Sequence, residues 1–207
     1  MDLDGNWEYG FGFYNRGNYP EYGAYAHHFP AVENQHVYFP LHPFQFGTVH
    51  IHPDNGKAIP MFSHDDLYSV LKIRDVYTAN TFLNNNNLNG DALFVSVLVV
   101  IQNDIKHTYA IKIDDISKLR SLEALKANEE DWIDFGNEMS EAYAGDDGDG
   151  TNGSAYEYQV ALLKFIEDND LGVSLYEMNQ TNPGPNVAET WDKLTLSNTT
   201  VIKTPCN

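Results

Sequence analysis

The sequence predicts a single α/β domain, and three observations support that fold class. The chain of 207 residues has the size of one such domain, or of one domain with a small appendage. Hydrophobic residues make up 42% of it and aromatic residues 13%, which is enough to build a packed core. Patterns typical of strands and patterns typical of helices both occur along the chain, so the fold mixes the two kinds of element.

The first part of the chain is predicted to be mostly strand. Aromatic residues alternate with small ones through 7–46, which favours β structure. Two strands are expected over 22–29 and 36–41, with a hairpin turn between them. So dense a set of aromatic residues also suits a surface that binds a glycan or a peptide, although aromatic residues pack into cores more often.

The middle of the chain is predicted to alternate between helix and strand. A stripe of apolar residues predicts a helix over 64–76. The run 93–101 is nearly all apolar and β-branched, which predicts a central strand covered on both faces. The alternation in 107–113 predicts an antiparallel partner strand. His107 lies on the apolar face of that strand, where we expect a core histidine with satisfied hydrogen bonds rather than a metal ligand.

The last part is predicted to be helical and then β. Asp115 or Ser117 is expected to cap a helix that continues towards Tyr143. Residues 146–154 form an acidic, glycine-rich loop. Its Asp-x-Asp spacing hints at calcium, but the glutamate that an EF-hand needs downstream is missing. The remaining expected elements are a helix over 155–169 and strands over 172–178 and 193–203.

One stretch carries the residues of a metal site. His50 and His52 stand two positions apart in a strand-like run, so both imidazoles point to the same face. Asp66 follows closely enough to supply a third ligand, which leaves a catalytic zinc one open position. Asp65 is the alternative third ligand if the loop between them shifts the register. Paired histidines on a strand are more often ordinary polar residues, so the prediction depends on the whole set.

Ser63 has two interpretations. Together with Asp66 it forms a Ser-x-x-Asp pattern, which is an ordinary helix N-cap with an acidic residue near the positive end of the helix. The same serine can instead serve as a polar catalytic group. The two roles are compatible, because a capped helix would hold the Asp66 carboxylate in place.

These residues resemble the signature of the JAMM (MPN+, JAB-like) zinc metallopeptidases. That signature is a glutamate, then His-x-His-Pro, then Ser-x-x-Asp, and His50, His52, Ser63 and Asp66 stand at the matching positions. The loop between His52 and Ser63 is about three residues longer than is usual in the family, an insertion that a surface loop tolerates at little entropic cost. The chain is thereby identified as a divergent bacterial member.

The resemblance implies a fold and a cofactor. The fold would be a mixed, mostly antiparallel sheet flanked by helices, as in JAMM and cytidine-deaminase-like proteins. Residues 1–145 would form the JAMM-like domain, with 155–207 packed on it. Zn²⁺ would be held by His50, His52 and Asp66.

The resemblance also implies a catalytic glutamate on an earlier strand, near a glycine. Glu21 lies in a strand-like stretch with Gly23 close by, whereas Glu33 lies in the expected hairpin turn. Because a turn residue points to solvent, Glu21 is the preferred base and Glu33 the alternative. In the family, this glutamate takes a proton from water and later protonates the leaving amine. Ser63 would donate a hydrogen bond to the oxyanion.

The expected function is therefore a zinc-dependent peptidase or isopeptidase with a polypeptide substrate. The alternative is a catalytically inactive JAMM-like binding or scaffold module, and a weaker third hypothesis is an aromatic-rich module that binds glycan. The long loop after His52 and the open choice of glutamate favour the scaffold alternative. Metal content separates the first hypothesis from the other two.

Charge and composition limit the partners. A net charge of −18 argues against nucleic acid and anionic membranes, which bind clustered Lys and Arg. No apolar run reaches the roughly 18–20 residues of a membrane span. The single cysteine, Cys206, excludes an internal disulfide and a cysteine-based zinc site. The acidic start lacks the apolar segment of a signal peptide, and the composition leans towards a bacterial surface or secreted protein of greater length.

Overall fold

A single eight-stranded sheet organises the chain, with strand order β2-β1-β3-β4-β5-β6-β7-β8. The computed structural model describes residues 8–15, 24–30, 37–53, 58–80, 94–102, 104–145, 153–179 and 190–206. Its strands are β1 (Tyr9–Asn15), β2 (Ala24–Pro30), β3 (Gln45–His52), β4 (Val95–Gln102), β5 (Ile105–Ile113), β6 (Val173–Met178), β7 (Trp191–Ser197) and β8 (Thr200–Pro205). Its helices are α1 (His64–Thr78), α3 (Ile116–Leu119), α4 (Ser121–Lys126), α5 (Glu129–Ala144) and α6 (Ala155–Asp168).

The sheet is mixed and mostly antiparallel, as the sequence predicted. Among its neighbouring strands only β3 and β4 run parallel, from Gly47 opposite Val95 to His52 opposite Val100. Parallel neighbours need a crossover connection, and α1 is the helix of that crossover. The crossover places the carboxyl end of β3 beside the amino end of α1.

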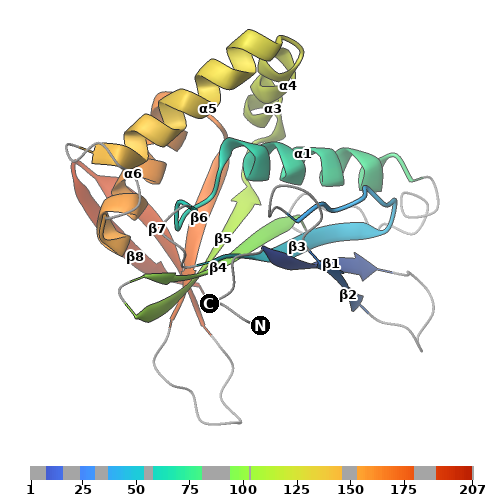
Figure 1. Cartoon of the computed structure of the whole chain (residues 1–207), viewed down its shortest axis with the longest axis horizontal. Helices are drawn as coiled ribbons and strands as arrows, with labels where there is room; N and C mark the ends of the chain where they lie inside the picture. The colour runs from blue at the N-terminus through green and yellow to red at the C-terminus, as the bar shows by residue number, and fades with distance from the viewer. Residues whose placement is uncertain are drawn as a thin grey trace.

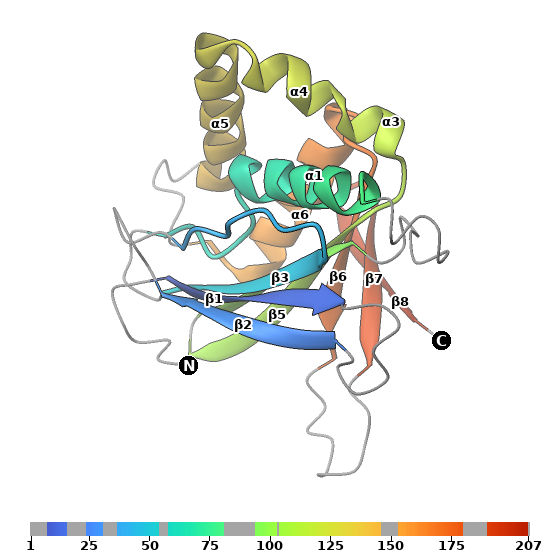
Figure 2. The same ribbon diagram turned by 90° about the vertical axis from the view of Figure 1, so that its right-hand side faces the viewer.

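The described helices lie over one face of the sheet, and the core fills the space between the two layers (Figures 1 and 2). The prediction that 93–101 is covered on both faces is therefore wrong. In β4, Leu98 and Val100 are buried, whereas Val97 and Val99 alternate with them and stay partly exposed. Valine is favoured in strands because its branched side chain suits the pleated backbone, so a continuous apolar run does not require two covered faces.

Helix α1 matches its prediction closely, whereas the long helix expected after Asp115 is interrupted. Asp115 caps α3 by accepting a hydrogen bond from Ser117 N, so of the two predicted caps it is the one used. A second cap, Asn128, has extended backbone and starts α5 as a separate helix. Short polar side chains that bond to the next backbone N–H groups stop one helix and start another.

Near the end of the chain, two strands form where one was expected. Residues 193–203 form parts of β7 and β8, joined by a turn in which Asn198 has φ 55°. Asparagine is one of the few residues that tolerate this left-handed conformation. Because β6, β7 and β8 continue the same sheet as β1 to β5, residues 155–179 and 190–206 share one architecture with the rest of the described chain.

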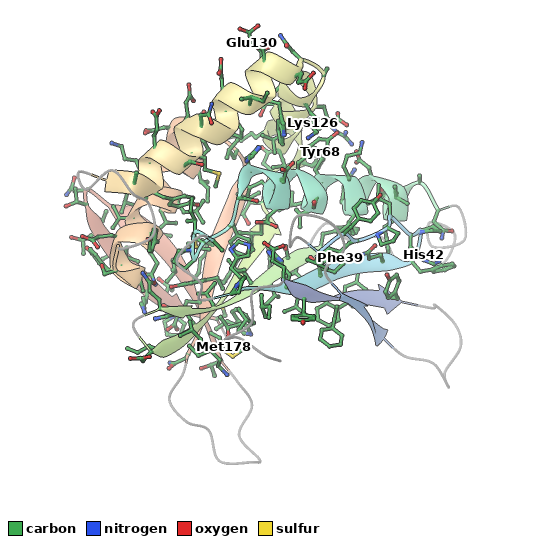
Figure 3. All side chains as sticks on the ribbon, viewed as in Figure 1. Phe39, His42, Tyr68, Lys126, Glu130 and Met178 are labelled. Carbon is green, nitrogen blue, oxygen red and sulfur yellow. The ribbon has the colours of Figure 1, made fainter. Side chains whose placement is uncertain are left out.

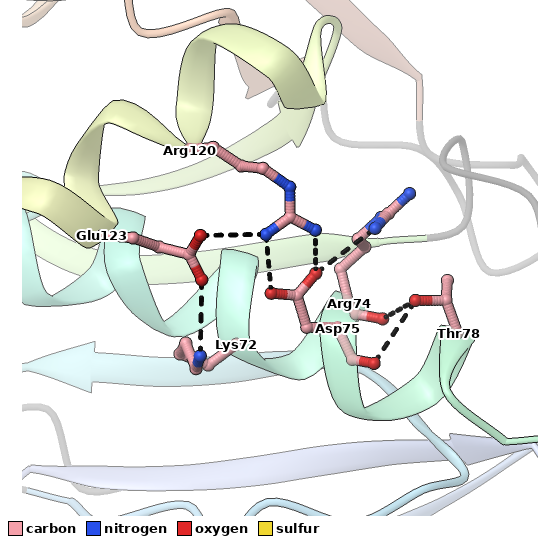
Figure 4. A network of polar contacts seen from close by, with 6 residues as sticks. All are labelled: Lys72, Arg74, Asp75, Thr78, Arg120 and Glu123. Carbon is pink, nitrogen blue, oxygen red and sulfur yellow. Dashed lines mark hydrogen bonds and ion pairs between the residues drawn. The ribbon is translucent and has the colours of Figure 1, made fainter.

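A polar network attaches α1 to the short helices (Figure 4). Arg120 donates to both carboxylate oxygens of Asp75, at 2.7 and 3.2 Å, and to Glu123 at 3.0 Å. Lys72 lies 3.7 Å from the other oxygen of Glu123. The two carboxylates also raise the pKa of Arg120. The network restrains α1 against α4. None of the described helices is long and apolar enough to cross a bilayer.

Candidate metal centre

Three predicted ligands meet where β3 ends and α1 begins. His50 and His52 lie at the carboxyl end of β3, opposite Leu98 and Val100 of the parallel strand β4. Asp66 lies in the first turn of α1. One ligand atom from each of the three residues lies within 4.8 Å of the others. The parallel crossover explains this meeting, because it returns the chain over the carboxyl end of β3, the position where ligands bind in parallel sheets.

His50 is buried without a hydrogen-bonding partner. Its side chain is 3% exposed, and neither ring nitrogen has hydrogen-bond geometry with another group. Its Nε2 lies 3.2 Å from Asp66 Oδ1. A buried polar atom without a partner is costly. A cation between the imidazole and the carboxylate would satisfy both atoms, so these residues fit a metal ion.

His52 is oriented by the loop that follows it. Its Nδ1 lies 2.7 Å from the carbonyl oxygen of Ile59. A carbonyl only accepts, so Nδ1 carries the proton and the lone pair is left on Nε2. A backbone partner on the far ring nitrogen is the usual support of a metal-binding histidine. The lengthened loop, which raised doubt about the register of Asp66, therefore supplies a contact that helps the site.

The Asp66 carboxylate is divided between two tasks. Its Oδ2 accepts from Ser63 N at 2.7 Å and from Ser63 Oγ at 2.8 Å, while Asp66 N donates to Ser63 Oγ at 3.3 Å. This reciprocal capping box confirms the helix-cap interpretation of Ser63. Because Oδ2 is held by Ser63, Oδ1 is left facing the two histidines.

The electrostatics of the three residues are coupled. Burial lowers the pKa of His50, but the neighbouring carboxylate of Asp66 outweighs it, so the pKa is raised. Burial would raise the pKa of Asp66, but His50, His52 and the Ser63 N–H outweigh it and hold that pKa far below its usual range. Burial and the charge of His50 lower the pKa of His52. The site therefore keeps an ionised carboxylate beside one neutral imidazole, which are the forms that bind metals.

The structure adds a glutamate that the sequence reasoning missed. Glu8 is 8% exposed and lies immediately before β1. Its Oε2 accepts from Val37 N at 3.1 Å, and its Oε1 lies 3.8 Å from His52 Nε2. Glu21 and Glu33, the two predicted candidates, lie outside the described residues.

A signal for Glu8 was present in the sequence. Glu8 stands two residues before Gly10, at the head of a strand in which glycine alternates with aromatic residues. Gly10 pairs with His50 in the antiparallel register of β1 and β3. The start of β1 must therefore lie beside the end of β3. That pairing, which local sequence does not reveal, brings Glu8 to the site.

The site opens into a cavity of about 760 Å³. Its floor includes Thr48 and Ser96, whose hydroxyls lie 3.1 Å apart, and its walls come from α1, α5 and residues 37–41. Phe39 covers His50, with ring centroids 6.5 Å apart. Figure 3 shows Phe39 and Tyr68 on opposite sides of α1. The cavity gives a bound molecule access to the three ligands and to Glu8.

Two further predictions have clear outcomes. His107 Nδ1 donates to Glu177 Oε1 at 3.0 Å and the ring stacks on Tyr109, so it is a hydrogen-bonded histidine, as predicted. Asp65, the alternative ligand, is 63% exposed and pairs with Lys126 at 3.4 Å. Asp66, not Asp65, belongs to the cluster of ligand atoms.

Comparison of the chain with protein-family models, with curated proteins and with solved structures found no significant match. The resemblance to the JAMM family therefore depends on the motif residues alone.

Proposed function

We propose that this chain is a zinc-dependent hydrolase with a JAMM-like fold that cleaves peptide or isopeptide bonds. One observation carries the proposal: His50, His52 and Asp66 converge in a cavity that also contains the buried carboxylate of Glu8. The JAMM-like fold is supported by the parallel β3–α1–β4 unit, which carries all three ligands.

The donor set suits a catalytic zinc. Two imidazoles and one carboxylate are ligands of catalytic zinc sites, which keep a fourth position open. His50, His52 and Asp66 Oδ1 would hold the ion. When bound, zinc supplies a Lewis acid that activates water and polarises the scissile carbonyl.

Glu8 is the general base in this proposal. Because Val37 N–H holds one carboxylate oxygen, the other is kept on the side of His52. From there it takes the proton of the attacking water and delivers it to the leaving amine. A carboxylate that is almost fully buried is held in one place, which general-base catalysis requires.

Ser63 is proposed to have a second role besides its cap. Its hydroxyl borders the cavity and points to Asp66 Oδ2. Rotation about χ1 would turn the hydroxyl towards an oxyanion, while Ser63 N continues to hold Asp66. The backbone contact therefore allows the hydroxyl to serve catalysis without releasing the ligand.

The cavity is suited to a polypeptide. Tyr38 and Leu41 line it and are 68% and 46% exposed, which is high for large apolar side chains. Apolar groups at the mouth and polar groups at the base of a cavity are typical of sites that bind a chain and react at one bond.

The experiment is a cleavage assay on the untagged, zinc-loaded protein with a pool of peptides and isopeptide-linked peptides. We expect cleavage that a chelator removes and zinc restores. Zinc binding without any cleavage would favour the scaffold alternative, and absence of both would refute the hydrolase and the metal site together.

A further inference from the structure

One basic side chain, that of Lys72, lines the cavity among its described residues. The described lining includes the acidic side chains of Glu8, Asp65 and Asp66, and among lysine and arginine residues only Lys72. The chain has 12 basic residues against 30 acidic ones. Its overall field therefore repels anions. A lysine at this wall gives the cavity one local position where an anionic group is stabilised.

The ammonium of Lys72 is only weakly engaged. It lies 3.7 Å from Glu123 Oε1 and 5.8 Å from the centre of the Tyr68 ring. No hydrogen bond is formed at that distance. Glu123 is already neutralised by Arg120, which donates to its other oxygen (Figure 4). The charge of Glu123 is therefore already balanced without Lys72.

Lys126 lies near Lys72 but outside the cavity lining, and it shows what a fully engaged lysine looks like. Lys126 Nζ lies 4.4 Å from the centre of the Trp132 ring and 5.6 Å from that of Tyr68. It also donates to Asp65 Oδ1 at 3.4 Å. A cation that faces two aromatic rings and a carboxylate is held in place. Lys72 has no such set of contacts, and 33% of its side chain is exposed.

The position of Lys72 relative to the ligands fits a peptide. Lys72 follows Asp66 by six residues on α1, which is about 9 Å along the helix axis and about 120° around it. Both residues nevertheless line the same cavity. An extended peptide advances about 3.3–3.6 Å per residue. An anionic group about two to four residues from the scissile bond therefore comes within reach of a flexible lysine side chain.

We propose that Lys72 is a specificity residue that binds a carboxylate of the substrate, an inference that rests on the hydrolase function proposed above. Three ammonium N–H donors are available to a carboxylate oxygen. The carboxylate belongs either to the C-terminus of the substrate or to an acidic side chain near the scissile bond. Both have the same chemistry, and the substrates can distinguish them.

The test measures binding of three fluorescein-labelled tetrapeptides to the full chain. The first is tetra-alanine with a free C-terminal carboxylate, the second its C-terminal amide, and the third an amide that ends in glutamate. Binding is measured by fluorescence anisotropy with zinc-loaded and with chelator-treated protein. The proteins are the parent, Lys72→Met, Lys72→Glu and the matched control Lys126→Met.

We expect the parent to bind a carboxylate form about tenfold more tightly than the amide, the lower range for a charge-assisted hydrogen bond at a partly exposed lysine. Lys72→Met should bring the two within about twofold, because methionine keeps the packing of the stem and removes the charge. Lys72→Glu should prefer the amide. Lys126→Met should keep the parent preference. The peptide that gains, free acid or glutamate, identifies the source of the carboxylate.

Two results would overturn the inference: a parent with no preference for a carboxylate, or a preference that survives in Lys72→Met. The second would mean that a metal ion binds the carboxylate directly. A Lys72-dependent preference that persists after chelation, in a protein that neither binds zinc nor cleaves peptides, would refute the hydrolase and leave the anion site standing.

Discussion

Two histidine–carboxylate pairs on the helix-covered face of the sheet differ in what completes them. His50 approaches Asp66 at 3.2 Å, has no hydrogen bond of its own, and is joined by His52. His107 is hydrogen-bonded to Glu177 at 3.0 Å, and Lys203 reaches the same carboxylate at 2.5 Å.

The difference lies in the cation that faces each carboxylate. The His107–Glu177 pair has one from within the chain, Lys203, and the His50–Asp66 pair has no lysine or arginine in the described residues. At Asp66 a second imidazole takes that place. A pair that lacks its cation, and whose nitrogens are buried without partners, is the one that needs a metal ion.

The largest expected effect is on turnover at Glu8. Glu8→Gln keeps the side-chain shape but cannot take a proton, so cleavage should fall by about 10²-fold or more. Zinc content should stay at the parent level. Steady-state kinetics and elemental analysis on the same preparations measure both quantities.

Glu21→Gln and Glu33→Gln are the controls for that result. Glu21 and Glu33 are the two bases that the sequence predicted, and neither lies among the described residues. We expect both variants to cleave at the parent rate. A loss at Glu21 with Glu8→Gln unaffected would transfer the base to Glu21.

Zinc should raise the free energy of unfolding through the His50–Asp66 pair and not through the His107–Glu177 pair. An ion at about 1,000 times its dissociation constant adds about 4 kcal/mol to the free energy of unfolding. Thermal unfolding with and without a chelator should show this shift in the parent and in His107→Ala. The shift should vanish in His52→Ala. An equal shift in His52→Ala would place the ion elsewhere.

Removing the charge of Glu177, which pairs with His107 and Lys203, should lower the free energy of unfolding in a pH-dependent way. Burial would raise the pKa of Glu177, but hydrogen bonds from His107 and Lys203 outweigh it and lower that pKa below its usual range. A lowered pKa stabilises the fold above the unfolded value, and this contribution is lost as the pH falls through the folded value. Glu177→Gln should therefore be less stable than the parent by about 1–2 kcal/mol at neutral pH.

The same variant should converge with the parent on acidification. As the pH falls through the lowered pKa of Glu177, the parent loses the contribution of the ionised carboxylate, whereas Glu177→Gln has none to lose. Denaturant unfolding at a series of pH values measures the gap. A gap that stays constant down to pH 2 would show that charge at Glu177 contributes nothing.

The smallest expected effect distinguishes Ser63, a helix cap with a proposed catalytic role, from Ser154, a helix cap only. Ser63 with Asp66 and Ser154 with Glu157 form two capping boxes of the same kind. Ser63→Ala and Ser154→Ala should each lower the free energy of unfolding by about 1 kcal/mol. Only Ser63→Ala should also slow cleavage, because only the Ser63 hydroxyl can turn towards an oxyanion, while Ser63 N still holds Asp66. Equal turnover in both variants would reduce Ser63 to a cap.

The sequence could predict the ligands because they are local. His50 and His52 share a strand face, and Asp66 follows from the cap of the next helix, so periodicity and capping identify all three. Glu8 depends on the antiparallel pairing of β1 with β3, more than 40 residues away. No local pattern reports that pairing. The one-sided cover of β4 was missed for the same reason, since tertiary packing decides which face is buried.

The most direct test of the metal centre is the zinc content of the untagged protein. Elemental analysis after dialysis against metal-free buffer should give about one zinc per chain, the stoichiometry of a single three-ligand site. The His50→Ala/His52→Ala double variant should carry almost none, and His107→Ala should match the parent. A parent without zinc, or a double variant with full occupancy, would contradict the account.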